Sequence, residues 1–256
     1  MASDTRVDEI ADGIYRISTF LPGVLTPEGV TVNQFLVLAE EPLLFHTGMR
    51  STFPALVSAL RPLLPAADLR WVSFGHVEAD ECGALEPLLA VAPSAQVASG
   101  DVGWPATAAD LSDRPVHILR PGDRLDLGGR RLLHMPTPHA PHNREAQVLF
   151  EETTGTLLSG DLFAQVGRGP AIGGCDLVEA ALATEEAHPS ASPGPAVPDA
   201  LRNLALLGPR TIATMHGTTF EGDGTTALLE LAKAWEVRFG QEARTASGDG
   251  LRSPHE

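Results

Sequence analysis

The hydrophobic residues of the chain follow two patterns: short runs typical of strands, and longer segments with a helical period. The runs rich in Val, Ile, Leu and Phe predict strands over residues 13–18, 32–39, 43–46, 69–74, 96–98, 116–119, 131–135, 147–151, 156–159 and 211–215. The i, i+3, i+4, i+7 spacing and its breakers predict helices over about 51–61, 83–91, 176–187, 199–207 and 225–238. Strands in both halves, with helices between them, predict an α/β domain in which helices lie outside two packed sheets.

The composition limits the class of protein. Hydrophobic residues make up 43% of the 256 positions, which is enough to bury a sizeable core and excludes a disordered chain. No uninterrupted apolar run approaches the length of a membrane span, and the acidic start does not look like a secretory signal. We therefore expect a cytoplasmic protein that does not contact membranes, with one domain over residues 1–240 and a polar, flexible tail over 241–256.

Charge and cysteine content exclude several partners. Eighteen basic against 33 acidic residues give a formal net charge of −15, so no basic surface is expected to bind nucleic acid. The two cysteines, Cys82 and Cys175, do not form a C-x-x-C pair, which argues against thiolate zinc sites and a disulfide framework. Any metal must therefore be bound by histidines and carboxylates.

Potential metal ligands are concentrated after the predicted strand at 69–74. His76, Glu78 and Asp80 occupy alternate positions and Glu81 follows directly, so four candidate ligands fall within six residues. A loop at a strand end can turn alternate side chains to one side. The alternative is that Asp80 and Glu81 only stabilise the start of the next helix, while His76 and Glu78 face water.

Three positions further along the chain favour the metal site. His142, Asp161 and His216 each lie where a predicted strand gives way to a loop. Loops at one edge of an α/β sheet converge, and binding sites form there. Each residue alone has an ordinary structural explanation: His142 as a surface turn residue, Asp161 as a turn or cap residue, and His216 as a buried imidazole. These explanations would all have to hold at once to account for the pattern.

This set of residues resembles the metallo-β-lactamase superfamily, in its flavodiiron or oxygen-binding di-iron branch, over about residues 8–238. The motif is His76-x-Glu78-x-Asp80, then His142, Asp161 after a glycine, and His216 before a glycine. The resemblance implies an αβ/βα sandwich of two mixed β-sheets flanked by helices. It also implies that one metal is bound by His76, Glu78 and His142, and the other by Asp80 and His216. Asp161 is implied to be the catalytic bridge between the two metals.

The sequence departs from the family at one position and leaves two histidines open. The family has a histidine directly after the aspartate, where this chain has Glu81. If Glu81 binds the second metal, that metal has a carboxylate-rich ligand set. If Glu81 does not bind it, the second metal has too few ligands and the site could hold a single ion. His139 lies close to His142, but His142 has the spacing to Asp161 that matches the family, so we expect His139 next to the site or on the surface. His46 ends an earlier strand, either as a donor to a ligand carboxylate or as a polar terminus.

The charge of the candidate ligands favours iron. Glu78, Asp80, Glu81 and Asp161 offer four negative charges to two divalent ions, which leaves a neutral site. Hydrolytic two-zinc sites keep more positive charge to acidify water. Oxygen-rich ligand sets suit iron or manganese, whereas zinc has no redox chemistry. Two metal ions are expected, with iron ahead of zinc or manganese.

The leading hypothesis is a non-haem di-iron oxidoreductase that binds or reduces dioxygen or nitric oxide. In the flavodiiron proteins that it resembles, a flavodoxin-like domain delivers electrons; the given sequence stops at Glu256, so we expect no fused flavin domain and a separate electron-donor protein, or a sensor. The alternatives are a metal-dependent hydrolase with a metal-bridging hydroxide and a binding module without metal. A homodimer stays open.

Overall fold

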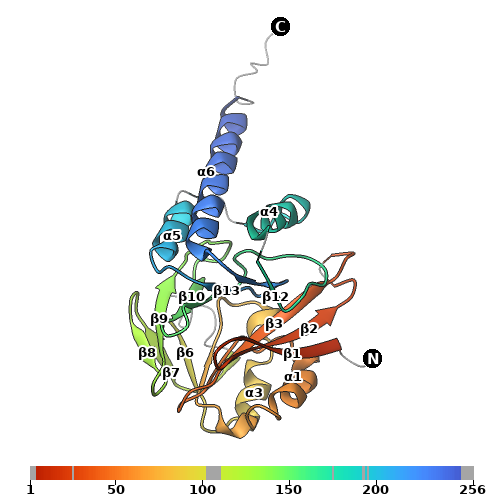
Figure 1. The fold of residues 1–256 in the computed structure, drawn as a ribbon, viewed down its shortest axis with the longest axis vertical. Coiled ribbons are helices and arrows are strands. Elements are labelled where there is room, and N and C mark those ends of the chain that lie inside the picture. Colours follow the sequence, from red (N-terminus) through yellow and green to blue (C-terminus); the bar gives the residue numbers. More distant parts are fainter. Residues whose placement is uncertain are drawn as a thin grey trace.

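The computed structural model describes residues 4–24, 26–101, 111–174, 176–191, 194 and 196–248, and these contain two seven-stranded sheets (Figure 1). The first sheet has the order β1 (Asp4–Ala11), β2 (Ile14–Leu21), β3 (Val30–Val37), β4 (Leu43–Phe45), β5 (Trp71–Ser73), β6 (Gln96–Gly100), β7 (Val116–Leu119). The second has the order β12 (Ile172–Gly173), β14 (Thr219–Glu221), β13 (Thr211–Ala213), β11 (Thr156–Leu158), β10 (Gln147–Glu151), β9 (Arg131–Pro136), β8 (Arg124–Asp126). The α-helices are α1 (Phe53–Leu60), α2 (Ala79–Cys82), α3 (Leu85–Val91), α4 (Leu177–Ala187), α5 (Ala196–Ala205) and α6 (Gly224–Gly248).

Both sheets are mixed. Strands β1 to β4 are antiparallel neighbours, and β4 to β7 are parallel, connected by segments that include α1 and α3. In the second sheet β8 to β11 are antiparallel, and β13 pairs in parallel with β11. Parallel neighbours end at the same edge of a sheet, so the loops after β4 and β5, and those after β11 and β13, are brought together in pairs.

Hydrophobic clusters fill the space between the layers. One lies between the two sheets and includes Phe35 and Phe45 from the first sheet and Leu149 and Leu158 from the second, all fully buried. A second packs α1 and α3 against the outer face of the first sheet, and a third packs α4, α5 and α6 against the second (Figure 1). Burial of this apolar surface is the main stabilising contribution to such a layered fold. The expected sandwich of two mixed sheets flanked by helices is confirmed.

Differences from the predicted elements have local reasons. Strand β1 carries charged residues along an exposed edge, so it has little hydrophobic signal. The two-residue strand β12 lies inside the glycine-rich segment 167–174, which the sequence pattern assigns to a loop. Helix α6 continues to Gly248, ten residues beyond its predicted end. Residues 249–256 of the expected tail lie outside the described residues, and so does Cys175.

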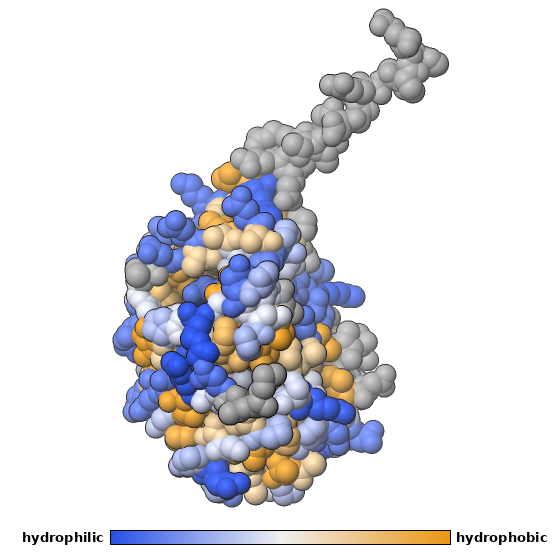
Figure 2. All heavy atoms as spheres, turned by 90° about the vertical axis from the view of Figure 1, so that its right-hand side faces the viewer, coloured by the Kyte–Doolittle hydropathy of each residue, from blue (hydrophilic) through white to orange (hydrophobic). Residues whose placement is uncertain are grey.

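The length and hydropathy of the described helices decide whether one of them could cross a membrane. Among the described residues, no helix combines the length and the apolar character needed to cross a bilayer. On the face shown in Figure 2, hydrophilic and hydrophobic residues are interleaved.

Candidate metal centre

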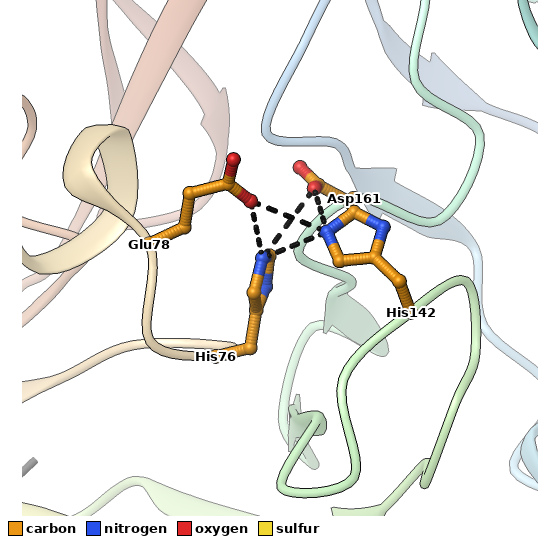
Figure 3. A group of neighbouring side chains, drawn as sticks. All are labelled: His76, Glu78, His142 and Asp161. Carbon is orange, nitrogen blue, oxygen red and sulfur yellow. Dashed lines mark hydrogen bonds and ion pairs between the residues drawn. The ribbon is translucent and has the colours of Figure 1, made fainter. Parts of the chain in front are cut away.

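The candidate ligands lie on loops that follow strands of both sheets. His76 and Glu78 follow β5, and Asp80 lies in the short helix α2. His142 lies in the loop after β9, Asp161 follows β11, and His216 follows β13. Figure 3 shows the side chains of the first two converging with those of His142 and Asp161 from the opposite side.

Four of these residues form a compact group of ligand atoms. One atom each from His76, Glu78, His142 and Asp161 lies within 4.8 Å of the other three. Nε2 of His76 is 2.8 Å from Oε2 of Glu78 and 2.9 Å from Nε2 of His142 (Figure 3). Oδ2 of Asp161 is 3.3 Å from Nε2 of His142. The group offers two imidazole nitrogens and two carboxylates to one point, which is a ligand set for a divalent metal.

A second group lies on the other side of Asp161. Nε2 of His216 is 3.2 Å from Oδ2 of Asp80 and 3.4 Å from Oδ1 of Asp161. The two carboxylate oxygens of Asp161 therefore face different groups: Oδ2 faces His142, and Oδ1 faces His216. A carboxylate with one oxygen toward each of two ligand groups has the arrangement of a metal bridge.

Unpaired buried atoms support this interpretation. Oδ1 of Asp80 and Oδ1 of Asp161 are buried without a hydrogen-bond partner. Buried polar groups are almost always paired, so a carboxylate oxygen that lacks a partner inside a ligand group fits the binding of an ion. Nδ1 of His216 donates to the carbonyl of Thr31 at 2.8 Å, which leaves Nε2 free to bind a metal. The residues present fit a metal centre with two ions.

Neighbouring carboxylates increase the proton affinity of the histidines in both groups. Burial alone would lower the pKa of His142 and His216, but the carboxylates of Asp161 and Asp80 outweigh it and raise both values to about 9. Hydrogen bonds from His142 and His76 lower the pKa of Glu78 to about 2. Without an ion, protons occupy the histidines, and metal binding must displace them.

A cavity opens directly onto both groups. It has a volume of about 470 Å³, and its walls include Glu78, Asp80, His142, Asp161 and His216. The remaining lining residues come mainly from the segment after β11 and from the C-terminal end of α4: Thr26, Val30, Ala164, Gln165, Val166, Thr184, Ala187, His188, Pro189 and Ser190. A cavity of this size accommodates a small molecule next to the candidate ligands.

Three other predicted site residues lie outside the two groups. Glu81 is fully buried, and its Oε1 lies 3.1 Å from Nδ1 of His76, the ring nitrogen that does not face the other ligands. His46 is fully buried too, with Nε2 3.5 Å from Oε2 of Glu81 and Nδ1 3.2 Å from the carbonyl oxygen of Asn33. His139 is exposed, and its backbone N–H donates to the carbonyl of Asn143 at 2.8 Å.

Comparison with known proteins identifies the family. A family model described as "ODP family beta lactamase" matches residues 30–182, which is more than half of the chain. The chain belongs to this family. Its fold is the metallo-β-lactamase fold of flavodiiron cores: the metal-soaked Flv1 flavodiiron core from Synechocystis sp. matches with a TM-score of 0.80 over 92% of this chain and 61% of that one, at 24% identity. The rubredoxin oxygen:oxidoreductase structure from Desulfovibrio gigas matches with a TM-score of 0.72 over 89% and 62%, at 22% identity.

Several similar curated sequences are named as oxidoreductases or reductases. The chain is 26% identical over 150 residues to the rubredoxin-oxygen oxidoreductase of Megalodesulfovibrio gigas. It is 28% identical over 148 residues to the anaerobic nitric oxide reductase flavorubredoxin of Salmonella arizonae. Each alignment covers 55% of this chain, but 35% and 30% of the two relatives, so the chain spans about a third of their length. The predicted relationship to the flavodiiron branch is confirmed.

Two features of the site could not be predicted from the sequence. His188 lies in the cavity wall, but it follows a helix far along the chain and has no spacing relation to the motif. The carbonyl of Thr31, which orients His216, belongs to the backbone of β3. Backbone acceptors have no side-chain signature, so only the register of the strands reveals them.

Proposed function

We propose that this protein is a non-haem di-iron oxidoreductase that binds and reduces dioxygen or nitric oxide. The observation that carries the proposal is the position of Asp161, whose two oxygens lie 3.3 Å from His142 and 3.4 Å from His216. A site for one ion does not need a carboxylate that faces two ligand groups. The names of the similar curated oxidoreductases support the same reaction class.

In this proposal each ion has its own protein ligands and shares one. His76, Glu78 and His142 hold the first ion, Asp80 and His216 hold the second, and Asp161 holds both. The second ion then has fewer protein ligands than the first. A metal with few protein ligands keeps positions open for a substrate or water.

Iron would supply the change of oxidation state that reduction of dioxygen or nitric oxide requires. The chain supplies position and charge. The side chains of Asp80, Asp161 and His216 are at most 10% exposed, so water does not screen the charges that they place around the ions. Glu78, which is half exposed, faces the cavity from the first group and closes the site on that side.

The cavity and an external donor complete the proposal. Dioxygen or nitric oxide would enter through the 470 Å³ cavity, in which His188 and Ser190 provide polar groups that can bind water. Reduction of dioxygen to water needs more electrons than two ferrous ions hold. A flavin- or iron-containing donor is therefore part of the proposed activity.

The decisive experiment is elemental analysis followed by gas-consumption measurements. Protein purified without oxygen and loaded with ferrous iron is expected to hold two irons per chain. In the presence of a chemical reductant it is expected to consume dioxygen or nitric oxide, and the zinc-loaded protein is expected to consume neither. Protein that retains zinc, gives no reaction with either gas and cleaves an ester or a lactam would instead be a metallo-hydrolase.

A further inference from the structure

A buried carboxylate lies directly behind the candidate metal centre. The side chain of Glu81 has no exposed surface. Its Oε2 accepts a hydrogen bond from the backbone N–H of His76 at 2.6 Å, and its Oε1 lies 3.1 Å from Nδ1 of the same histidine. One carboxylate thus contacts both the main chain and the ring of a single candidate ligand.

The opposite side of the Glu81 carboxylate is closed by His46. Nδ1 of His46 lies 3.2 Å from the carbonyl oxygen of Asn33, which can only accept, so Nδ1 carries a proton. Nε2 of the same ring lies 3.5 Å from Oε2 of Glu81. A histidine ring thus lies close to each oxygen of the Glu81 carboxylate.

The backbone leaves space for this carboxylate and for little else. A Cβ atom at Gly75 would lie 2.9 Å from Oε2 of Glu81, and one at Gly160 would lie 3.4 Å from Oε1. The backbone of Glu81 is fixed as well, because its carbonyl accepts the N–H of Thr47 at 2.6 Å. A side chain held on so many sides cannot swing toward the second ligand group without rearranging the loop.

We propose that Glu81 is a positioning residue that orients His76, and that it is not itself a metal ligand. Nε2 of His76 points to Glu78 and His142, at 2.8 and 2.9 Å, whereas the Glu81 carboxylate lies at Nδ1 of the same ring. A metal bound at Nε2 would leave the ring proton on Nδ1, which faces Oε1 of Glu81 at 3.1 Å. A carboxylate in this position fixes the ring and increases its basicity.

This inference rests on the proposed metal centre, and it predicts that the two ions bind unequally. Glu81 strengthens the first group, through His76, and adds no ligand to the second. The second ion keeps Asp80, His216 and the shared Asp161. It should be the first to leave when free metal is lowered.

The test isolates the first group and then changes Glu81. In a His216→Ala background a single cobalt(II) ion is expected, bound by the first group, and its affinity is measured by titration against a chromophoric chelator. Glu81→Gln in this background is expected to weaken cobalt binding by about 10- to 100-fold, as for other outer carboxylates. The amide nitrogen cannot accept the backbone N–H of His76, so one of the two donors loses its acceptor.

Control variants separate this role from a general effect on folding. Glu145→Gln removes another carboxylate that contacts the same loop, through the backbone N–H of Val77 at 3.4 Å, and is expected to leave the affinity unchanged. Glu81→Asp keeps the charge but shortens the side chain, and is expected to give an intermediate loss. In the cobalt protein, the hyperfine-shifted Nδ1–H signal of His76 should exchange faster with solvent in Glu81→Gln than in the parent.

Two results are decisive against the inference. If Glu81→Gln leaves the single-site affinity unchanged and lowers the full protein from two ions to one, Glu81 is a ligand of the second ion. If the Nδ1–H exchange is also unchanged, the carboxylate does not orient the ring. Wild-type protein that binds cobalt with this dependence on Glu81 but consumes neither gas would refute the proposed function and leave this assignment standing.

Discussion

Replacement of Asp161 by asparagine is the sharpest test of the two-ion site. The change keeps the shape of the side chain, so the fold should be preserved, but it removes one negative charge and turns one oxygen into an amide nitrogen that does not bind metals. In the structure the two oxygens lie 3.3 Å from His142 and 3.4 Å from His216. The variant must therefore weaken at least one of the two groups, whichever way the amide turns.

The magnitude follows from the charge and its surroundings. Two opposite unit charges about 4 Å apart attract each other by about 4 kcal/mol at an effective dielectric constant near 20. The side chain of Asp161 is 10% exposed, so solvent screens it little. Since about 1.4 kcal/mol corresponds to a tenfold change, the loss of this charge predicts a decrease of roughly a thousandfold in affinity for the weaker ion.

The assay is a count of bound metal at fixed free metal. Wild-type and Asp161→Asn protein are dialysed against the same buffered ferrous or cobalt(II) concentration, and metal per chain is measured by mass spectrometry. Two ions are expected in the wild type, and one or none in the variant. Asp199→Asn, which changes an exposed carboxylate on α5, is the matched control and should keep both ions. Two ions bound by Asp161→Asn with wild-type affinity would show that this residue is not the bridge.

Three further predictions concern single groups. His216→Ala should deplete one ion and retain the other, because its Nε2 faces only the second group and the shared Asp161; metal per chain reports this. Burial alone would raise the pKa of Glu151, but hydrogen bonds from Thr153 and Thr154 outweigh this effect and lower the pKa below its usual value. Glu151→Gln should therefore cost about 1 to 3 kcal/mol of unfolding free energy at pH 7. This difference should shrink at lower pH, where the native carboxylate is protonated. Urea unfolding of both proteins at pH 7 and at an acidic pH checks it. Leu228→Ala should cost about 2 to 5 kcal/mol at any pH, because this leucine of α6 is fully buried in the cluster between the helices and the second sheet.

The fold was predictable wherever hydrophobic residues alternate with clear breakers. The predicted strands at 116–119 and 147–151 coincide with β7 and β10. The edge strands β1 and β12 were not predictable, because they bury few side chains. Strand β1 is mostly exposed, and β12 contributes two residues whose pairing with β14 is a property of the backbone.

The candidate ligands were predictable as a set because each follows a strand. The motif residues His76, His142 and Asp161 do come together in the structure, from positions far apart in the sequence. The position of Glu81 was not predictable, since residues 80 and 81 both lie in the same short helix, α2, and point in different directions. The sequence identifies both carboxylates but not which of them faces His216 and which faces Nδ1 of His76.

The negative charge of Glu81 favours iron whether or not its carboxylate binds a metal directly. Its carboxylate is fully buried 3.1 Å from the ring of His76, where little water screens it, so the ions experience its charge through that ligand. Together with Glu78, Asp80 and Asp161 it would balance the charge of the two divalent ions of the proposed site. A fourth carboxylate ligand would occupy a coordination position on the second ion. With Glu81 behind His76, that position would stay open. Charge balance and an open coordination position compete when every carboxylate is a ligand. We infer that the site can have both, because the carboxylate of Glu81 acts from behind His76.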